Sequence, residues 1–489
     1  MTTSSEVHGY SLSAASLRGE RVVVFGVVKN IILAINDGTD EHAFVVNDDQ
    51  VVRDVALLET PGGACCVVSG GDGKRINVYN VPSVQGTKDQ SIQHNGTHTG
   101  TLALAFSFGP HSKRITHVAT SDDATILFAD KFGEVFRLGF LWGPNQNIMA
   151  AGGEVAPVFL LQHFSVMSTF FLSAPLRQPK CGQDSLQTAS TRAGLAASRR
   201  LFTFDKDRHA RVSCYPETFR IQQYLWTDAP QSVVTSITEI PDTAESGRYS
   251  YFVVGCHNGT VHLWVADNMA PSECIADPFT LIGSIVAQKS VPKGDEEVSA
   301  VVSVVCLTSS SPGSDSRVDE SHSRGILITC ANTMDVIFVP LRKSDDNHKL
   351  LFCADGATRT RLESFPVAMV GYSTDSALVL QRSGRVQVLQ LTHGDGPVVA
   401  HLAEAQHAPL EKAIGGLLQG PLRTLLSEMD LFAQWNYDAV DPRARKKNTR
   451  ASSEDCDEEG EAEECETAMA TQSGSSSSKK TRTEHSGVV

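Results

Sequence analysis

The residues best suited to chemistry are charged and lie in one short segment, residues 205–211, which reads Asp-Lys-Asp-Arg-His-Ala-Arg. Asp205 and Asp207 are two residues apart, which is a spacing that a pair of catalytic carboxylates could have. In a tight turn that also contains Lys206 and Arg208, they are better explained as turn-forming residues and surface ion pairs. Taken alone, the segment indicates a solvated loop tip, with a binding surface as the alternative.

Other patterns favour structure over catalysis. His163 could be a metal ligand or a general base, but we favour a structural histidine that begins a repeat and hydrogen-bonds inside it. The glycine-rich residues 69–73 lie inside a hairpin with no helix after them, so they predict a turn rather than a nucleotide loop. The eleven cysteines include no Cys-x-x-Cys pair and are predicted to be thiols in a reducing compartment. We therefore predict no catalytic, cofactor-binding or metal-binding residues, and no cofactor.

The elements that position these residues are short β-hairpins of one design. Each has an apolar strand, a tight polar turn and an alternating strand, and the six lie at residues 65–81, 125–138, 201–215, 251–265, 326–340 and 377–391. The segment 255–264, Gly-Cys-His-Asn-Gly-Thr-Val-His-Leu-Trp, is similar to the end of a WD-repeat blade. Repeated hairpins predict an all-β propeller. Strands expected at residues 21–28, 30–36 and 42–47 would supply a seventh blade and close the ring.

The spacing of the hairpins exceeds a regular WD repeat, so we expect loop insertions near residues 175–200, 266–296 and 308–324. The propeller is predicted to occupy residues 1–420. Apolar residues at helical spacing predict an amphipathic helix at 421–440. Residues 441–489 alternate basic, acidic and serine-rich stretches and are predicted to be a disordered, charged tail.

The charge balance argues against a chain that binds nucleic acid unaided. The formal net charge is −14, and the segment 443–489, with eight Lys/Arg and ten Asp/Glu, leaves −12 for the rest. A lone nucleic-acid binder needs a basic footprint, which here would have to be a local patch. The basic run Arg443, Arg445, Lys446 and Lys447 is interpreted as a nuclear import signal or a phosphate contact, so we expect a nuclear protein. No secretory signal or membrane span is expected.

Three segments resemble a known family, in its order along the chain. Residues 128–136 (Phe-Ala-Asp-Lys-Phe-Gly-Glu-Val-Phe), 160–167 (Leu-Leu-Gln-His-Phe-Ser-Val-Met) and 203–216 (Thr-Phe-Asp-Lys-Asp-Arg-His-Ala-Arg-Val-Ser-Cys-Tyr-Pro) are similar to the WD-repeat non-catalytic subunit of tRNA (guanine-N7)-methyltransferase. The resemblance covers mainly residues 125–265. Gln162 stands where the family has glycine, and residues 225–229 replace an expected Gly-His.

The resemblance implies a heterodimer in which this chain has no catalytic role. It would support a Rossmann-fold, S-adenosylmethionine-binding subunit that methylates the variable-loop guanine of tRNA, and would meet tRNA mainly through the complex. The family's docking arginine falls on Arg211. Lys206, Arg208, Asp205 and Asp207 belong to the same partner-binding loop. The alternative for Arg211 is an ion pair with Asp205 or Asp207 inside its own blade.

Two other functions are weighed against this one. A generic WD-repeat scaffold, such as a ubiquitin-ligase substrate receptor or a ribosome-assembly factor, would share the fold but not the motif around Arg211. An enzymatic propeller would need a metal or base constellation that the sequence does not offer. Co-purification would separate the scaffold from the methyltransferase subunit, and binding of S-adenosylmethionine by the single chain would revive the enzyme.

Overall fold

The computed structural model describes most of the strands of the chain. The described residues are 12–17, 22–36, 41–60, 63–81, 92–94, 97–100, 102–121, 123–139, 156–163, 165–175, 199–225, 232–240, 248–268, 279–287, 299–308, 324–344, 349–393, 400–404, 418 and 423–424. They all belong to the compact unit 1–434, and the second unit, 435–489, lies outside them. Among them, no helix is long and apolar enough to cross a membrane.

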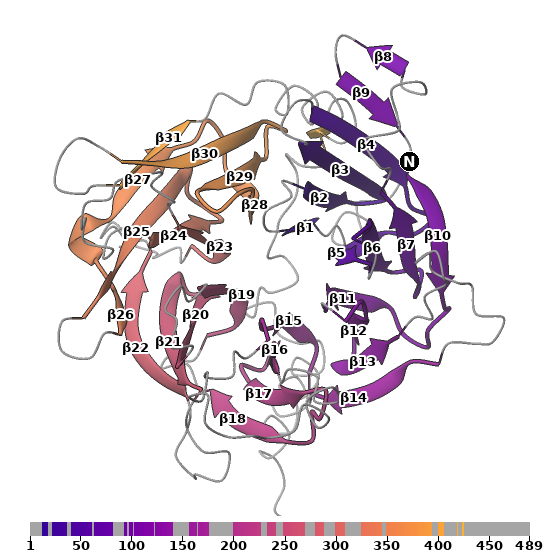
Figure 1. The fold of residues 1–489 in the computed structure, drawn as a ribbon, viewed down its shortest axis with the longest axis horizontal. Coiled ribbons are helices and arrows are strands. Elements are labelled where there is room, and N and C mark those ends of the chain that lie inside the picture. The colour runs from indigo at the N-terminus through magenta and orange to yellow at the C-terminus, as the bar shows by residue number, and fades with distance from the viewer. Residues whose placement is uncertain are drawn as a thin grey trace, which may run out of the picture. The chain divides into compact units, whose positions relative to one another are not determined.

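The described strands form seven sheets arranged around a central axis (Figure 1). Blades 1 to 3 consist of β1 (Leu12–Leu17), β2 (Val22–Val27), β3 (Asn30–Asn36) and β4 (Glu41–Asn47); β5 (Val52–Glu59), β6 (Cys65–Gly71), β7 (Ile76–Asn80) and β10 (Ala103–Phe108); and β11 (Ile115–Thr120), β12 (Ile126–Asp130), β13 (Glu134–Leu138) and β14 (Val158–Gln162). Blades 4 and 5 consist of β15 (Met167–Leu172), β16 (Arg199–Asp205), β17 (Ala210–Tyr215) and β18 (Ile221–Leu225); and β19 (Val234–Ile240), β20 (Tyr249–Cys256), β21 (Thr260–Asp267) and β22 (Phe279–Val286). Blades 6 and 7 consist of β23 (Val301–Thr308), β24 (Arg324–Cys330) and β25 (Asp335–Lys343) with the paired outer pieces β26 (Leu350–Phe352) and β27 (Thr358–Arg361); and β28 (Pro366–Gly371), β29 (Ser376–Gln381), β30 (Val386–His393) and β31 (Ala400–Glu404).

The protein is therefore a seven-bladed β-propeller, as the hairpin repeat predicts. All six expected hairpins form the second and third strands of blades 2 to 7, and the three expected N-terminal strands form β2 to β4 of blade 1, to which β1 adds an inner strand that the sequence did not predict. In each blade the first strand lies innermost, and the four successive strands pair antiparallel with one another. A hairpin at β8 (Ile92–His94) and β9 (Thr97–Gly100), which the sequence did not predict, extends blade 1 because β9 pairs in parallel with β4.

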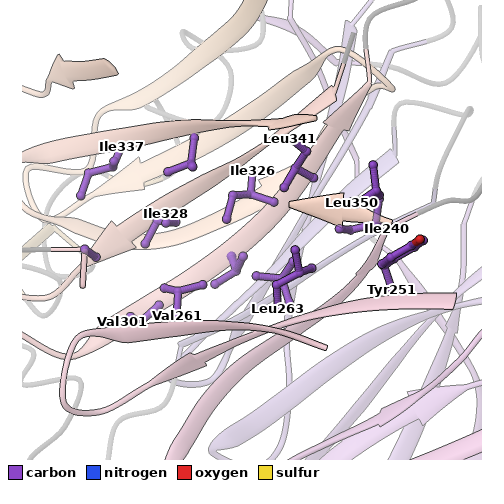
Figure 2. Close-up of a cluster of buried hydrophobic side chains, with 14 of the residues drawn as sticks. Ile240, Tyr251, Val261, Leu263, Val301, Ile326, Ile328, Ile337, Leu341 and Leu350 are labelled. Carbon is purple, nitrogen blue, oxygen red and sulfur yellow. The ribbon is translucent and has the colours of Figure 1, made fainter. Parts of the chain in front are cut away.

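Packing between neighbouring blades makes the core. Successive side chains of a strand point to opposite faces of the sheet, and apolar side chains lie on both faces. Each blade therefore packs one apolar face against the blade before it and the other against the blade after it. Between blades 5 and 6, for example, Val261 and Leu263 belong to one buried cluster with Ile326, Ile328 and Ile337 (Figure 2). The inner strands line a central cavity of about 530 Å³.

The ring closes between the first and last blades without exchanging a strand. The four strands β1 to β4 complete blade 1, and the four strands β28 to β31 complete blade 7. Side-chain packing joins them: Val23, Phe25 and Ile32 of blade 1 belong to the same buried cluster as Leu378 and Val388 of blade 7. Closure at this joint therefore rests on apolar burial.

Neighbouring inner strands are also linked by polar side chains at one repeated position. In six blades the inner strand has a β-bulge near its start. In four of these blades, the side chain of the residue after the bulge forms a hydrogen bond with the backbone of the next blade. Asp54 accepts the Val118 N–H at 2.8 Å, and Ser303 accepts the Met369 N–H at 3.3 Å. The remaining two links are His117 to the Ser168 carbonyl at 3.0 Å and Ser236 to the Val304 N–H at 3.1 Å.

The structure differs from the predicted domain plan at one of the expected loop insertions. The insertion expected near residues 266–296 is partly wrong, because residues 279–286 form β22, the outer strand of blade 5. Its sequence, Phe-Thr-Leu-Ile-Gly-Ser-Ile-Val, does not alternate strictly between apolar and polar residues, so the period of a half-buried strand is missing there. Most of the insertions expected near 175–200 and 308–324 lies outside the described residues, as do the tail and, apart from Arg423 and Thr424, the helix expected at 421–440.

Candidate partner-binding site

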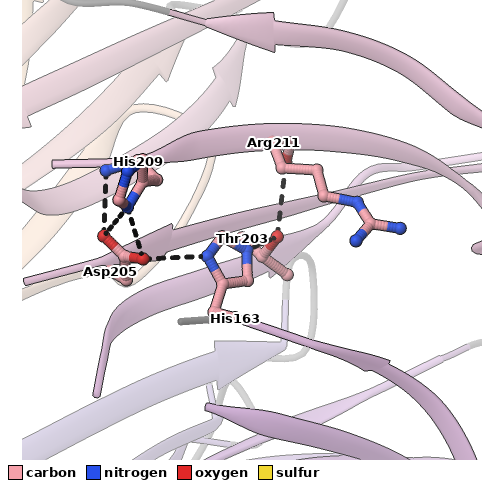
Figure 3. Close-up of polar contacts among 5 residues, drawn as sticks. All are labelled: His163, Thr203, Asp205, His209 and Arg211. Carbon is pink, nitrogen blue, oxygen red and sulfur yellow. Dashed lines mark hydrogen bonds and ion pairs between the residues drawn. The ribbon is translucent and has the colours of Figure 1, made fainter. Parts of the chain in front are cut away.

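The charged segment singled out from the sequence is the turn between β16 and β17 of blade 4. Asp205 is fully buried and fixes this turn, because its carboxylate accepts the His209 N–H at 2.9 Å and the His209 imidazole Nδ1–H at 2.9 Å. His163, which precedes blade 4, brings its Nδ1 to 3.2 Å from the same carboxylate (Figure 3). The interpretation of His163 as a histidine that hydrogen-bonds inside the repeat is confirmed.

The hydrogen bonds to Asp205 control its ionisation. Burial opposes the negative charge, but hydrogen bonds from His163 and His209 outweigh it, so the pKa of the Asp205 carboxyl lies below its ordinary value. A carboxylate only accepts, so Nδ1 of His163 carries a proton, and Nε2 lies 2.6 Å from the Thr203 hydroxyl oxygen. The network therefore ties β16 to the segment before β15.

Thr203, His163 and Asp205 have the order of a nucleophile, a base and an orienting acid. Their exposed fractions are 0, 6 and 0%, so a substrate cannot reach the Thr203 hydroxyl. Within the described residues, no group of three or more His, Cys, Asp or Glu side chains could hold a metal ion. The arrangement stabilises a blade rather than performing a reaction.

Arg211 turns away from this network, with its guanidinium on the side remote from Asp205 (Figure 3). Its Nε donates to the Ser213 hydroxyl at 2.9 Å, and Nη2 donates to the Thr218 carbonyl at 2.7 Å. Both acceptors are neutral, and no carboxylate among the described residues pairs with Arg211. The alternative that Arg211 pairs with Asp205 or Asp207 is wrong.

The other residues of the predicted loop differ in how far they are exposed. Asp207 and Arg208 are exposed at the tip of the turn, and Arg208 has a left-handed backbone with φ of 71°. Lys206 is half-buried, and both its burial and nearby Arg114 lower the pKa of its ammonium group. The structure thus places Asp207, Arg208 and Lys206 at one end of blade 4, while the Arg211 side chain lies along its side. Arg443, Arg445, Lys446 and Lys447 lie outside the described residues.

The sequence did not predict an apolar surface that adjoins Arg211. Five of the eight large hydrophobic side chains that are exposed in the described residues lie on the outer strands of blades 3 and 4 or on the turn before β18. We call this surface the blade 3–4 rim; it comprises Val158 (59% exposed), Phe159 (54%), Phe219 (78%), Ile221 (40%) and Tyr224 (47%). No signal in the sequence marks these side chains as exposed, because their exposure depends on how the blades are arranged.

Thr218 connects this rim to Arg211. Its carbonyl accepts the Arg211 bond, its hydroxyl donates to the Leu160 carbonyl of blade 3 at 2.5 Å, and the next residue is Phe219. Tyr224 is the cross-strand neighbour of Arg211. A cation and an apolar surface therefore meet at the junction of two blades. Such a combination is typical of a protein-docking site, because monomers rarely leave apolar side chains grouped on the surface.

Seven blades of antiparallel strands with tight turns make this chain a seven-bladed β-propeller, and the His163–Asp205–Thr203 network lies within one of its blades. No protein-family model matches the chain. Among curated proteins it is similar to the tRNA (guanine-N(7)-)-methyltransferase non-catalytic subunit TRM82 of Kluyveromyces lactis, with 29% identity over 120 residues, or 24% of this chain and 21% of that protein. Similar solved structures include Saccharomyces cerevisiae Sqt1 (12% identity, 81% of this chain, 92% of that chain, TM-score 0.47) and the WD40 β-propeller domain of Doa1 (11%, 76%, 90%, 0.40).

Proposed function

We propose that this chain is the non-catalytic subunit of a tRNA (guanine-N7)-methyltransferase complex. It binds and stabilises a Rossmann-fold, S-adenosylmethionine-dependent subunit, which methylates N7 of the variable-loop guanine of tRNA. The observation that carries the proposal is Arg211 at the edge of the blade 3–4 rim, on the segment 203–216 that resembles the family. The 29% match to a protein with this role supports it.

Arg211 suits a carboxylate of the partner. An arginine has five N–H donors, and here one on Nε and one on Nη2 serve neutral acceptors. Burial lowers the pKa of the guanidinium, yet arginine stays charged at neutral pH. A partner carboxylate would meet the charged Arg211 guanidinium, which blade 4 already holds in place. The apolar surface beside it would exclude water from the ion pair.

The remaining parts of the proposal concern regions outside the described residues. The basic run at Arg443, Arg445, Lys446 and Lys447 would act as a nuclear import signal or contact tRNA in the complex. We accordingly propose a nuclear location. The acidic charge of the chain as a whole, −14, supports an arrangement in which the catalytic subunit supplies most of the affinity for tRNA.

Affinity purification of the full chain from its native cell tests the proposal directly. A Rossmann-fold methyltransferase should co-purify in stoichiometric amount, and the pair should methylate tRNA. Recovery of ubiquitin-ligase or ribosome-assembly components without a methyltransferase would identify a different WD-repeat scaffold instead.

Arg211→Leu tests the docking residue. If a partner carboxylate is buried against it, the complex should weaken by roughly 2–5 kcal/mol, or about 30- to 4,000-fold. The two intrablade hydrogen bonds have a charged donor and are worth up to about 1.5–3 kcal/mol each, so the stability of the isolated propeller is measured on the same variant to separate it from the loss of affinity. The control is Arg361→Leu on β27 of blade 6, away from the blade 3–4 rim, since Arg361 is exposed and pairs with Asp335. Equal partner affinity for both variants would remove Arg211 from the interface.

Phe219→Ser tests the apolar part of the surface. Phe219 is 78% exposed, so its replacement should leave the melting temperature unchanged while it weakens the complex about tenfold or more. Leu104→Ser is the matched control, because Leu104 is 56% exposed on the outer strand of blade 2. Both quantities can be measured by thermal melting and surface plasmon resonance.

A further inference from the structure

The turns between the second and third strands of the blades lie on one face of the ring, which we call the turn face. Antiparallel strands also bring the loops between consecutive blades to this face. In blades 5 and 6 the turn residues 257–259 and 331–334 contain no Lys, Arg, Asp or Glu. In blades 1 to 4 and 7 the turns carry cations, which are Lys29, Lys74, Arg75, Lys131, Lys206, Arg208, Arg382 and Arg385.

The cations of blades 2 and 3 form one continuous surface. The loop from β10 to β11 adds Lys113 and Arg114 between the two turns. Backbone hydrogen bonds hold these pieces together: the His111 N–H donates to the Lys74 carbonyl at 2.7 Å, and the Lys131 N–H donates to the Arg114 carbonyl at 3.1 Å. A local basic patch therefore exists in a chain whose net charge is −14.

The carboxylates nearby are mostly committed to other groups. Asp130 is fully buried beneath the turn of blade 3 and accepts the Phe132 and Glu134 N–H groups at 2.8 and 3.2 Å. Asp72 forms a bidentate pair with Arg53. Two further carboxylates lie close by, with Asp49 near Arg75 and Glu134 near Lys113. Within the described residues, however, no carboxylate forms an ion pair with Lys74, Arg75, Lys113, Arg114 or Lys131.

An exposed aromatic ring stands in the middle of this basic patch. Phe132 is 48% exposed, and the ammonium groups of Lys113 and Lys131 each lie 5.1 Å from its ring centroid. The turn is rigid, because Asp130 binds its backbone and Gly133 adopts a left-handed φ of 78°. A fixed aromatic ring between cations is the arrangement that proteins use to bind unpaired nucleotides, with a base on the ring and phosphates on the cations.

We propose that the turn face of blades 2 and 3 binds RNA directly, with Phe132 stacking on an unpaired base and Lys113 and Lys131 contacting the adjacent phosphates. The choice of tRNA as the RNA rests on the proposed function. The surface differs from the blade 3–4 rim, so one chain can hold the RNA and the catalytic subunit at the same time. It gives the non-catalytic subunit a part in presenting the tRNA.

The test measures binding of a fluorescent tRNA transcript to the full chain alone, at several salt concentrations. Lys113→Glu with Lys131→Glu should weaken binding about tenfold or more, and should reduce the slope of log affinity against log salt by about 1.4–1.8. Phe132→Ala should weaken binding about 5- to 150-fold with the slope unchanged. Arg342→Glu with Lys343→Glu, at the opposite end of β25, has the same charge change and should bind like the wild type.

Each other outcome would overturn the proposal. Wild-type affinity in Lys113→Glu/Lys131→Glu or in Phe132→Ala, with melting temperatures unchanged, would exclude the surface. An equal loss in the Arg342→Glu/Lys343→Glu control would mean that only net charge matters. Competition by poly-glutamate as effective as by unlabelled transcript would identify a site for an acidic protein. Assembly with the methyltransferase subunit is measured on the same variants and should not change, so failure of the proposed function is detected separately.

Discussion

His117 allows the joint between blades 3 and 4 to be tested with pH. Its Nε2 donates to the Ser168 carbonyl of blade 4 at 3.0 Å, and its Nδ1 lies 3.1 Å from the Thr116 hydroxyl. Burial lowers the pKa of the His117 imidazole to about 4, with a smaller contribution from Lys206. The folded protein therefore keeps this ring neutral at pH values where the unfolded chain takes up a proton.

The sign and the size of the effect follow from linkage. Between its unfolded pKa near 6.5 and its folded pKa near 4, acidification protonates His117 in the unfolded chain first, so stability falls as the pH falls through this window. From pH 7.5 to pH 5.0 the loss from this one group is about 2 kcal/mol. Below about pH 4, His117 is protonated in both states and causes no further loss of stability.

Urea unfolding of the wild type and of His117→Gln at pH 7.5 and 5.0 measures this loss. Glutamine keeps a donor for the Ser168 carbonyl but does not titrate. The pKa of His257 is also lowered by burial, but His257 is present in both proteins. The difference between the two proteins therefore isolates His117, and the variant should lose about 2 kcal/mol less than the wild type. An identical loss in both would refute the reasoning that burial keeps the imidazole neutral.

Three further predictions concern turns, tail and cofactor. Gly133→Ala should destabilise the protein by about 1–3 kcal/mol more than Gly63→Ala in thermal melts. Both glycines have a left-handed φ, but a Cβ at Gly133 would lie 2.3 Å from the Ser165 carbonyl oxygen, whereas a Cβ at Gly63 would meet open space. Removing residues 443–489 should leave the melting temperature unchanged and should reduce nuclear accumulation and salt-sensitive binding of tRNA by the complex; unchanged location and binding would contradict the role given to this segment. Calorimetry should detect no binding of S-adenosylmethionine to the single chain, and micromolar binding would contradict a non-catalytic role.

The hairpins could be predicted because their signal is local. An alternating strand, an Asn-Gly or Asp-Gly turn and a second alternating strand occupy fewer than about twenty residues, and the turn residues themselves set the backbone. The attachment of β8 and β9 to blade 1 has no such signal. It depends on parallel pairing between β4 and β9, whose first paired residues, His42 and His98, lie far apart in the chain.

The site was predictable only where residue type carries the function. The role proposed for Arg211 came from the family resemblance of residues 203–216, and the structural role of His163 came from its imidazole chemistry, because both are visible in the sequence. The acceptor that holds Arg211 is the backbone carbonyl of Thr218, which any residue would supply, so the sequence could not indicate it. The blade 3–4 rim depends on which face of an outer strand is left uncovered, and that is decided by the arrangement of the blades.

The way the ring closes has a consequence for the making of the protein. Val23, Phe25 and Ile32 belong to the first blade to leave the ribosome, yet the side chains that cover them, such as Leu378 and Val388, are translated near the end. About 350 residues separate the two groups, and translation at about 5–20 residues per second takes roughly 20–70 s to cover that distance. During this time the apolar face of blade 1 that blade 7 will cover is exposed to water, and such a face is prone to aggregate. Newly made chains should therefore depend on chaperones that shield the first blade until the seventh has been synthesised.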